Sequence, residues 1–172
     1  MMDFVISKFA MIVAAVFLLL AGIGIYEIQK SALEDEELQN IADKISRAVN
    51  ELNGINANTE VNISYNRSLG GLYLKPTVGG KGYSLQITRD LLFITQEGRK
   101  ISSNFIGNVH LWEPELRDYN ESQIANMDRV NKNLDVKSGE KVVIYVQRRQ
   151  IEGSGTGYLT FVYIVPEGEN TP

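Results

Sequence analysis

The side chains that most often perform chemistry are scarce in this chain. It has 172 residues, no cysteine and a single histidine, His110. The absence of cysteine excludes thiol catalysis, disulfide frameworks and cysteine-based zinc sites. His110 stands between Val109 and Leu111, and a lone histidine in an apolar segment is more typical of a strand than of a catalytic or metal site. We therefore expect no catalytic residue, no metal site and no cofactor, and we do not expect an enzyme.

Two further patterns bear on function. Gly153-Ser154-Gly155 lacks the G-x-S-x-G spacing of a nucleophile elbow, so it predicts a loop rather than a hydrolase site. The net charge is -4, and the 17 basic residues are spread along the chain. Proteins that bind nucleic acids usually concentrate basic residues on one face, so this distribution argues against a nucleic-acid partner.

Covalent modification is the other chemistry that the sequence could support. The pattern Asn-x-Ser occurs at Asn62, Asn66 and Asn120. These are candidate N-glycosylation sites if the protein is exported. We expect Asn62 and Asn66 to lie on the same polar face of one strand.

The apolar residues that would position such sites are concentrated at the N-terminus. Of the first 26 residues, 21 are hydrophobic, and residues 9–26 form an uncharged run of 18. As a helix this run is about 27 Å long, close to the thickness of the bilayer interior. A buried core helix and a cleaved secretory signal are the alternatives. We favour a retained transmembrane or filament-core helix over residues 1–27.

The flanking charges predict the orientation of this helix. Lys8 precedes the apolar run, whereas Glu27 and the acidic residues 34–37 follow it, opposed only by Lys30. Basic residues favour the cytoplasmic side of a membrane. We therefore expect contact with membrane lipid, a single pass, a cytoplasmic N-terminus and an extracellular C-terminal domain.

Residues 28–54 are predicted to extend the helix as an amphipathic segment. No glycine or proline occurs in residues 28–52, and the apolar positions recur at steps of 3, 4, 4 and 3, which places them on one helix face. Ser31 and Glu34 resemble a capping box, so a break near residues 29–31 is an alternative to a continuous or mildly kinked helix. The stripe, which we expect to pack on a sheet, is Leu38, Ile41, Ile45, Val49 and Leu52.

After Gly54 the pattern changes to the two-residue alternation of strands. We predict an α+β fold in which a small antiparallel β-sandwich or barrel-like domain occupies residues 55–166. Residues 141–148 and 158–165 are rich in β-branched and aromatic residues and are expected to pair as a long hairpin. We expect residues 113–136 to be mostly loop and residues 167–172 to be a flexible tail.

These features together resemble type IV pilins and pilin-like proteins, especially archaeal ones. The resemblance rests on Lys8 before the apolar run, the amphipathic extension to Leu52, the β domain and the segment from Leu74 to Ile87, and it covers about residues 4–112. It implies assembly by a type IV pilus-like machine, with the apolar helices bundled in a filament core. It also implies self-association or contact with other pilin-like subunits. The leader would be trimmed near Lys8, Phe9, Ala10 and Met11.

One detail distinguishes two hypotheses within this resemblance. The pilin peptidase usually expects a basic residue followed directly by glycine or alanine, but here Phe9 follows Lys8 and Ala10 comes one place later. The first hypothesis is a structural subunit, major or minor, of an archaeal-type surface filament. The alternative is an uncleaved, membrane-anchored extracellular β domain that binds a surface-layer protein or another envelope component.

Overall fold

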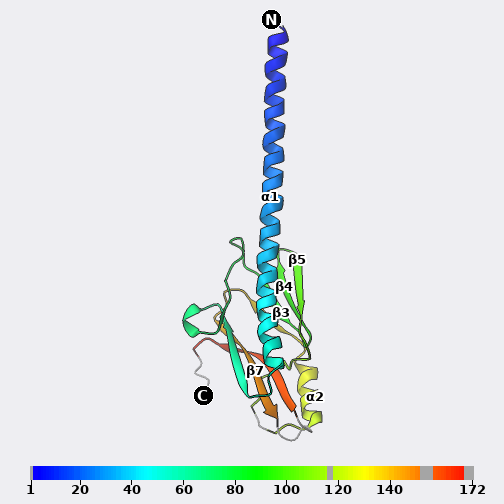
Figure 1. Ribbon diagram of the computed structural model, residues 1–172, viewed down its shortest axis with the longest axis vertical. Helices are drawn as coiled ribbons and strands as arrows, with labels where there is room; N and C mark the ends of the chain where they lie inside the picture. The colour runs from blue at the N-terminus through cyan, green and yellow to red at the C-terminus, as the bar shows by residue number, and fades with distance from the viewer. Residues whose placement is uncertain (1, 116–117, 152–156, 169–172) are drawn as a thin grey trace. The chain divides into compact units, whose positions relative to one another are not determined.

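The computed structural model describes residues 2–115, 118–151 and 157–168, with side chains from Lys8 onward. The fold is α+β (Figure 1): helix α1 (Met2–Asn53) precedes eight strands and a second helix, α2 (Glu121–Val130). The chain divides into two compact units, Met1–Glu36 and Glu37–Pro172. The last third of α1, from Glu37 to Asn53, therefore belongs to the same unit as the strands.

The first unit is helical throughout its described length. Helix α1 runs without a break through residues 29–31, so the alternative of two helices is not what forms. Every side chain from Lys8 to Lys30 is exposed. In the described part of the chain, one helix is long and apolar enough to cross a membrane. Its apolar window has a mean hydropathy of 2.5 and no buried residue.

The second unit has its main core around the amphipathic half of α1. All five stripe residues, Leu38 to Leu52, are buried, and Ala42 is buried beside them. They share one apolar cluster with residues from both sheets, among them Ile63, Leu85 and Ile144. The helix ends where the Gly54 amide bonds to the Asn50 and Glu51 carbonyls.

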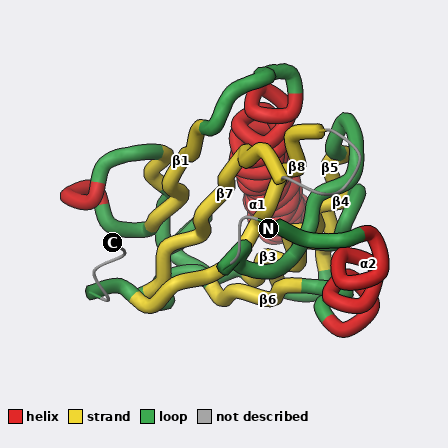
Figure 2. The backbone as a smooth tube through the Cα atoms, turned by 90° about the horizontal axis from the view of Figure 1, so that it is seen from below, coloured by secondary structure: helices red, strands yellow, loops and turns green. Residues whose placement is uncertain are grey.

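Eight strands form two four-stranded sheets (Figure 2). The first sheet has the order β2 (Leu72–Tyr73), β1 (Thr59–Ser64), β7 (Val142–Ile151), β8 (Gly157–Pro166). The second has the order β5 (Arg99–Asn104), β4 (Leu91–Gln96), β3 (Ser84–Ile87), β6 (Leu134–Lys137). All pairs are antiparallel except β1 with β2. The two sheets do not close into a barrel, so the barrel-like alternative is wrong.

The predicted long hairpin is confirmed. Strands β7 and β8 pair over ten residues, from Val142 with Pro166 to Ile151 with Gly157. The connector predicted at residues 153–157 lies mostly outside the described residues, as does most of the predicted tail at 167–172. The described part of that tail, Glu167 and Gly168, forms a turn.

The expectation that residues 113–136 are mostly loop is wrong, because α2 and β6 both form there. Asn120 caps α2 in a capping box: its side chain accepts from the Gln123 amide, and the Gln123 side chain accepts from the Asn120 amide. The half-buried Ile124 and Met127 then face a second apolar cluster. The capping box and the three-residue apolar step from Ile124 to Met127 thus stabilise a helix of ten residues.

This second cluster covers the face of the first sheet that points away from α1. Phe161 and Tyr163 of β8 and Ile151 of β7 pack there against Trp112 and Tyr119. Alternate residues of a strand point to opposite faces, so Val162 of β8 reaches the main core while its neighbours reach this cluster. Both faces of the β7–β8 hairpin are therefore covered.

Gly71, just before β2, approaches the backbone of β1 too closely for any side chain. It has φ +74°, and a Cβ there would lie 2.2 Å from the Asn62 carbonyl oxygen. We expect Gly71→Ala to lower the free energy of unfolding by at least about 3 kcal/mol, because strain and a backbone clash add. Gly98→Ala is the matched control, since Gly98 has φ +82° but open space around it; about 1 kcal/mol is expected. Urea unfolding measures both values, and an equal decrease in the free energy of unfolding of the two variants would contradict this account.

Three tyrosines should make the β domain sensitive to alkaline pH. Burial raises the pKa of Tyr65 and Tyr83 above the usual range and that of Tyr163 to about 12, with Glu113 and Glu60 adding to the last shift. An unfolded tyrosine ionises near pH 10. The stability is thus complete below pH 10 and falls as the pH rises toward 12, by up to about 1.4 kcal/mol per tyrosine per pH unit. Denaturant unfolding at increasing pH measures the slope, and Tyr163→Phe should reduce it. An unchanged slope in that variant would refute the assignment.

Candidate functional site

Three segments distant in sequence meet beside α2 in the second unit. Arg89 lies in the turn between β3 and β4, where its carbonyl accepts from the Val109 amide at 2.8 Å. His110 forms a short parallel bridge with Phe161 of β8. Its amide donates to the Thr160 carbonyl at 2.8 Å, and its carbonyl accepts from the Val162 amide at 2.7 Å. Hydrogen bonds of the main chain thus fix the positions of Arg89 and His110 independently of their side chains.

The side chains converge on Asp128 of α2, which is only 8% exposed. Its Oδ1 lies 2.8 Å from His110 Nδ1 and accepts from Trp112 Nε1 at 3.0 Å. Its Oδ2 lies 3.3 Å from Arg89 Nη2. Removing a carboxylate from water is costly unless it is paired and hydrogen-bonded. Three partners meet that requirement here, and together they hold α2 against the sheet.

This arrangement determines what His110 presents to its surroundings. An ionised carboxylate only accepts hydrogen bonds, so Nδ1 of His110 must carry the proton and donate it to Asp128. The other ring nitrogen, Nε2, has no partner among the described residues. His110 is itself 7% exposed and lines a pocket. Its unused nitrogen is thus the part available to a ligand.

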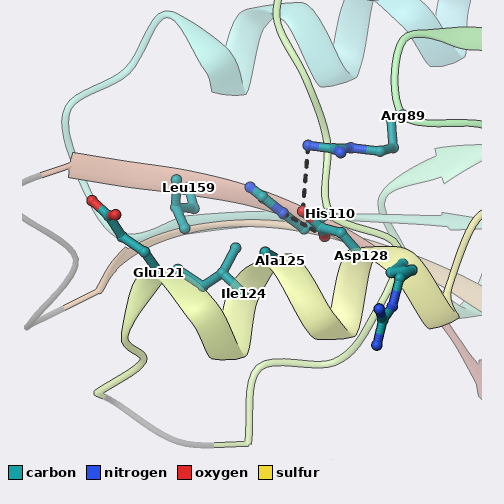
Figure 3. Close-up of a pocket in the computed structure, with 8 residues that line it drawn as sticks. Arg89, His110, Glu121, Ile124, Ala125, Asp128 and Leu159 are labelled. Carbon is teal, nitrogen blue, oxygen red and sulfur yellow. Dashed lines mark hydrogen bonds and ion pairs between the residues drawn. The ribbon is translucent and has the colours of Figure 1, made fainter.

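The pocket has a volume of about 450 Å³ and lies between α2, β8 and the β3–β4 turn (Figure 3). The pocket lining combines polar and apolar side chains. Nitrogen groups come from Arg89, His110 and Arg129, and carboxylates come from Glu121 and Asp128. The apolar wall is formed by Ile124, Ala125 and Leu159. Arg89 is 42% exposed in its side chain, and its Nε is buried without a hydrogen-bond partner.

Aromatic rings pack against His110 and Trp112 in this site. Trp112 packs edge-on against Phe161 and Tyr119, with ring centroids 4.9 and 5.0 Å apart. His110 lies 5.4 Å from Phe161. Such edge-to-face pairs add about 0.5–1.5 kcal/mol each beyond simple burial. Trp112 is the only tryptophan in the chain, so its fluorescence reports on this site alone.

Among the described residues, the lining of the pocket contains two carboxylates, Glu121 and Asp128, and no serine, threonine, cysteine, lysine or tyrosine. Among residues 2–115, 118–151 and 157–168, no three His, Asp or Glu side chains gather in a way that could hold a metal ion.

The residues singled out by the sequence lie elsewhere. Lys8, Phe9, Ala10 and Met11 are exposed residues of α1 in the first unit, and the stripe Leu38–Leu52 is in the main core of the second. None of these residues lines the pocket.

The three candidate glycosylation sites differ in environment. Asn62 lies in β1, half-buried, with its Oδ1 enclosed. Asn66 lies beyond the end of β1, so it does not share a strand face with Asn62; it caps a short 3-10 helix (Arg67–Leu69) and donates to Glu167 at 2.6 Å. Asn120 is exposed and uses its oxygen to cap α2, while its Nδ2 has no partner in the described part. Asn120 is the most accessible of the three.

Sequence reasoning treated His110 as an ordinary strand residue and did not identify Asp128 or Arg89. The missed signal was the Asn120-x-x-Gln123 capping box, which predicts a helix and places Asp128 in its last turns. The meeting of Arg89, His110 and Asp128 depends on long-range packing, which spacing does not reveal.

The comparisons with known proteins add no identification: no protein-family model, no curated protein and no solved structure matches the chain.

Proposed function

We propose that the chain is a pilin-like structural subunit, anchored first in a membrane and then in the core of a surface filament through α1. One observation carries the proposal. The apolar run of α1 is fully exposed in the isolated chain, whereas the stripe later in the same helix is buried in the β domain. One helix thus combines an unsatisfied apolar surface with a firm attachment to a folded domain.

The exposed run needs an apolar environment. Phe9, Phe17, Leu18 and Leu20 are each at least 60% exposed. Transfer of such side chains out of water is worth about 1.5–3 kcal/mol each. A bilayer supplies that environment, and so does a bundle of sister helices. Exchange of lipid for sister helices costs little, which permits a subunit to move from membrane to filament.

A second candidate is an uncleaved anchored β domain that binds an envelope component. It is favoured by the order of Lys8, Phe9 and Ala10, in which a large aromatic residue stands where a pilin peptidase usually expects glycine or alanine. The two candidates share the membrane anchor and differ in the fate of the leader.

The anchor is tested by fractionation of cells that express the full chain or a chain beginning at residue 28. We expect the full chain to stay with membranes after alkaline extraction and the shortened chain to be soluble, with the same near-ultraviolet circular dichroism in its β domain. A full chain that washes off the membrane would contradict the proposal, as would a shortened chain that is unfolded.

The fate of the leader is tested by the intact mass of the native protein. Loss of the residues before about Met11 supports the filament subunit. An intact N-terminus in mature material supports the anchored domain instead and would overturn the filament proposal.

A further inference from the structure

We propose that the pocket beside α2 binds a small organic monoanion, a carboxylate with an apolar body of about the size of hexanoate. The inference concerns the β domain alone and does not depend on the filament proposal. It follows from the distribution of charge, apolar surface and unused hydrogen-bonding atoms in the lining.

The charges in the lining favour an anion at one end. Asp128 Oδ1 contacts His110 and Trp112, and Oδ2 forms an ion pair with Arg89, so the negative charge of Asp128 is already balanced within the site and does little to attract a cationic ligand. Arg89 contacts Asp128 through Nη2, and its side chain is 42% exposed, so part of the guanidinium group is accessible; its Nε has no hydrogen-bond partner but is buried, and it is not among the accessible donors. Arg129 uses one nitrogen on Asn126 and also keeps donors free. Guanidinium groups with spare donors bind carboxylates well.

His110 supplies a second observation that points to a ligand. It is more than nine-tenths buried and lines the pocket, and within the described part of the chain no contact is made by Nε2, the ring nitrogen that does not face Asp128 (Figure 3). Asp128 fixes the ring in place through Nδ1, so Nε2 is held in one direction. In the neutral ring Nε2 accepts a hydrogen bond, and it donates to a carboxylate only when both ring nitrogens carry a proton.

The remaining wall selects an apolar body. Ile124, Ala125 and Leu159 line the pocket beside the charged end. A pocket of about 450 Å³ is in the range of small-molecule sites, in which a mainly apolar lining surrounds a few polar groups. Glu121 lies seven residues before Asp128 on α2, about 10 Å along the helix. It therefore stands apart from the anion end and disfavours a second negative charge on the ligand.

Trp112 provides the direct assay, because its indole donates to the same Asp128 oxygen that contacts His110. The purified full chain in neutral detergent is titrated with sodium hexanoate, n-hexylammonium chloride or sodium phosphate at constant ionic strength. We expect saturable quenching or shift by hexanoate in the millimolar range and at least about tenfold weaker responses to the other two probes. A stronger response to hexylammonium or to phosphate would overturn the proposal.

Matched variants assign the response to the pocket. Ala125 is exposed on α2, so both Ala125→Glu and Ala125→Lys should fold. We expect Ala125→Glu to weaken hexanoate binding about tenfold or more and Ala125→Lys to retain or strengthen it. Equal effects of the two substitutions would show that charge does not govern binding and would overturn the proposal.

His110→Asn tests the ring nitrogen. The asparagine amide can still donate to Asp128 in place of Nδ1 but offers nothing in place of Nε2. We expect about tenfold weaker hexanoate binding with an unchanged Trp112 spectrum in the free protein. Unchanged affinity in that variant would remove His110 from the site and contradict the inference.

Discussion

Replacement of Asp128 by alanine is expected to lower the free energy of unfolding of the β domain by about 3–5 kcal/mol. Asp128 is the shared hydrogen-bond partner of His110 and Trp112 and the ion-pair partner of Arg89, and it is 8% exposed. Its removal leaves the buried ring nitrogens of His110 and Trp112 without their partner, at about 1–3 kcal/mol each, and also removes the ion-pair partner of the partly exposed Arg89. The contact that holds α2 on the first sheet is lost at the same time.

Denaturant unfolding followed by Trp112 fluorescence measures this effect. Glu121→Ala is the matched control, because it removes a carboxylate from the same helix at an exposed position. A loss below about 1 kcal/mol is expected there, from the helix dipole alone. If the two variants lost the same stability, the Asp128 network would not be what holds α2.

Ile45→Ala is expected to lower the free energy of unfolding by about 2–5 kcal/mol. Ile45 is fully buried in the middle of the stripe, within the cluster shared by α1 and both sheets. A large-to-small change in a close-packed core loses the transfer free energy of the side chain and leaves a cavity. A loss of stability of this size would show that the last third of α1, Glu37–Asn53, is part of the folded domain rather than a linker.

Urea unfolding of the full chain in detergent provides the measurement. Arg47→Ala, an exposed change two residues away on the same helix, should alter stability by less than about 0.5 kcal/mol. If Ile45→Ala lowered the free energy of unfolding only slightly, α1 would not be packed into the core of the β domain. The attachment between the anchor and the domain would then be weak.

The helix and the main strands were predictable because each carries a local pattern. The 3, 4, 4, 3 steps of the stripe are set by helix geometry, and all five residues are buried. The β7–β8 hairpin was readable from two β-branched runs flanking a glycine-rich connector. In both cases neighbouring residues suffice to choose the conformation.

The pocket was not predictable by the same means. Arg89, His110 and Asp128 are separated by 21 and 18 residues, and nothing in their spacing requires them to meet. Helix α2 is ten residues long, too short for its apolar periodicity to outweigh its polar composition, and a capping box was its only clear signal. His110 contacts a carboxylate only because the packing of α2 brings Asp128 to it.

The apolar half of α1 remains the feature on which the proposed function depends. The chain has no cysteine, so one substitution introduces a unique thiol. Leu18 is 74% exposed within the apolar run, and Lys132 is an exposed residue of the β domain suited to a control.

The most direct test is oxidative cross-linking of native cell-surface material that carries Leu18→Cys. The filament proposal predicts disulfide-linked dimers in the sheared surface fraction, with few or none for Lys132→Cys, because sister helices meet in the core while that part of the β domain faces solvent. Recovery of Leu18→Cys only as an uncross-linked monomer in the membrane fraction would contradict it.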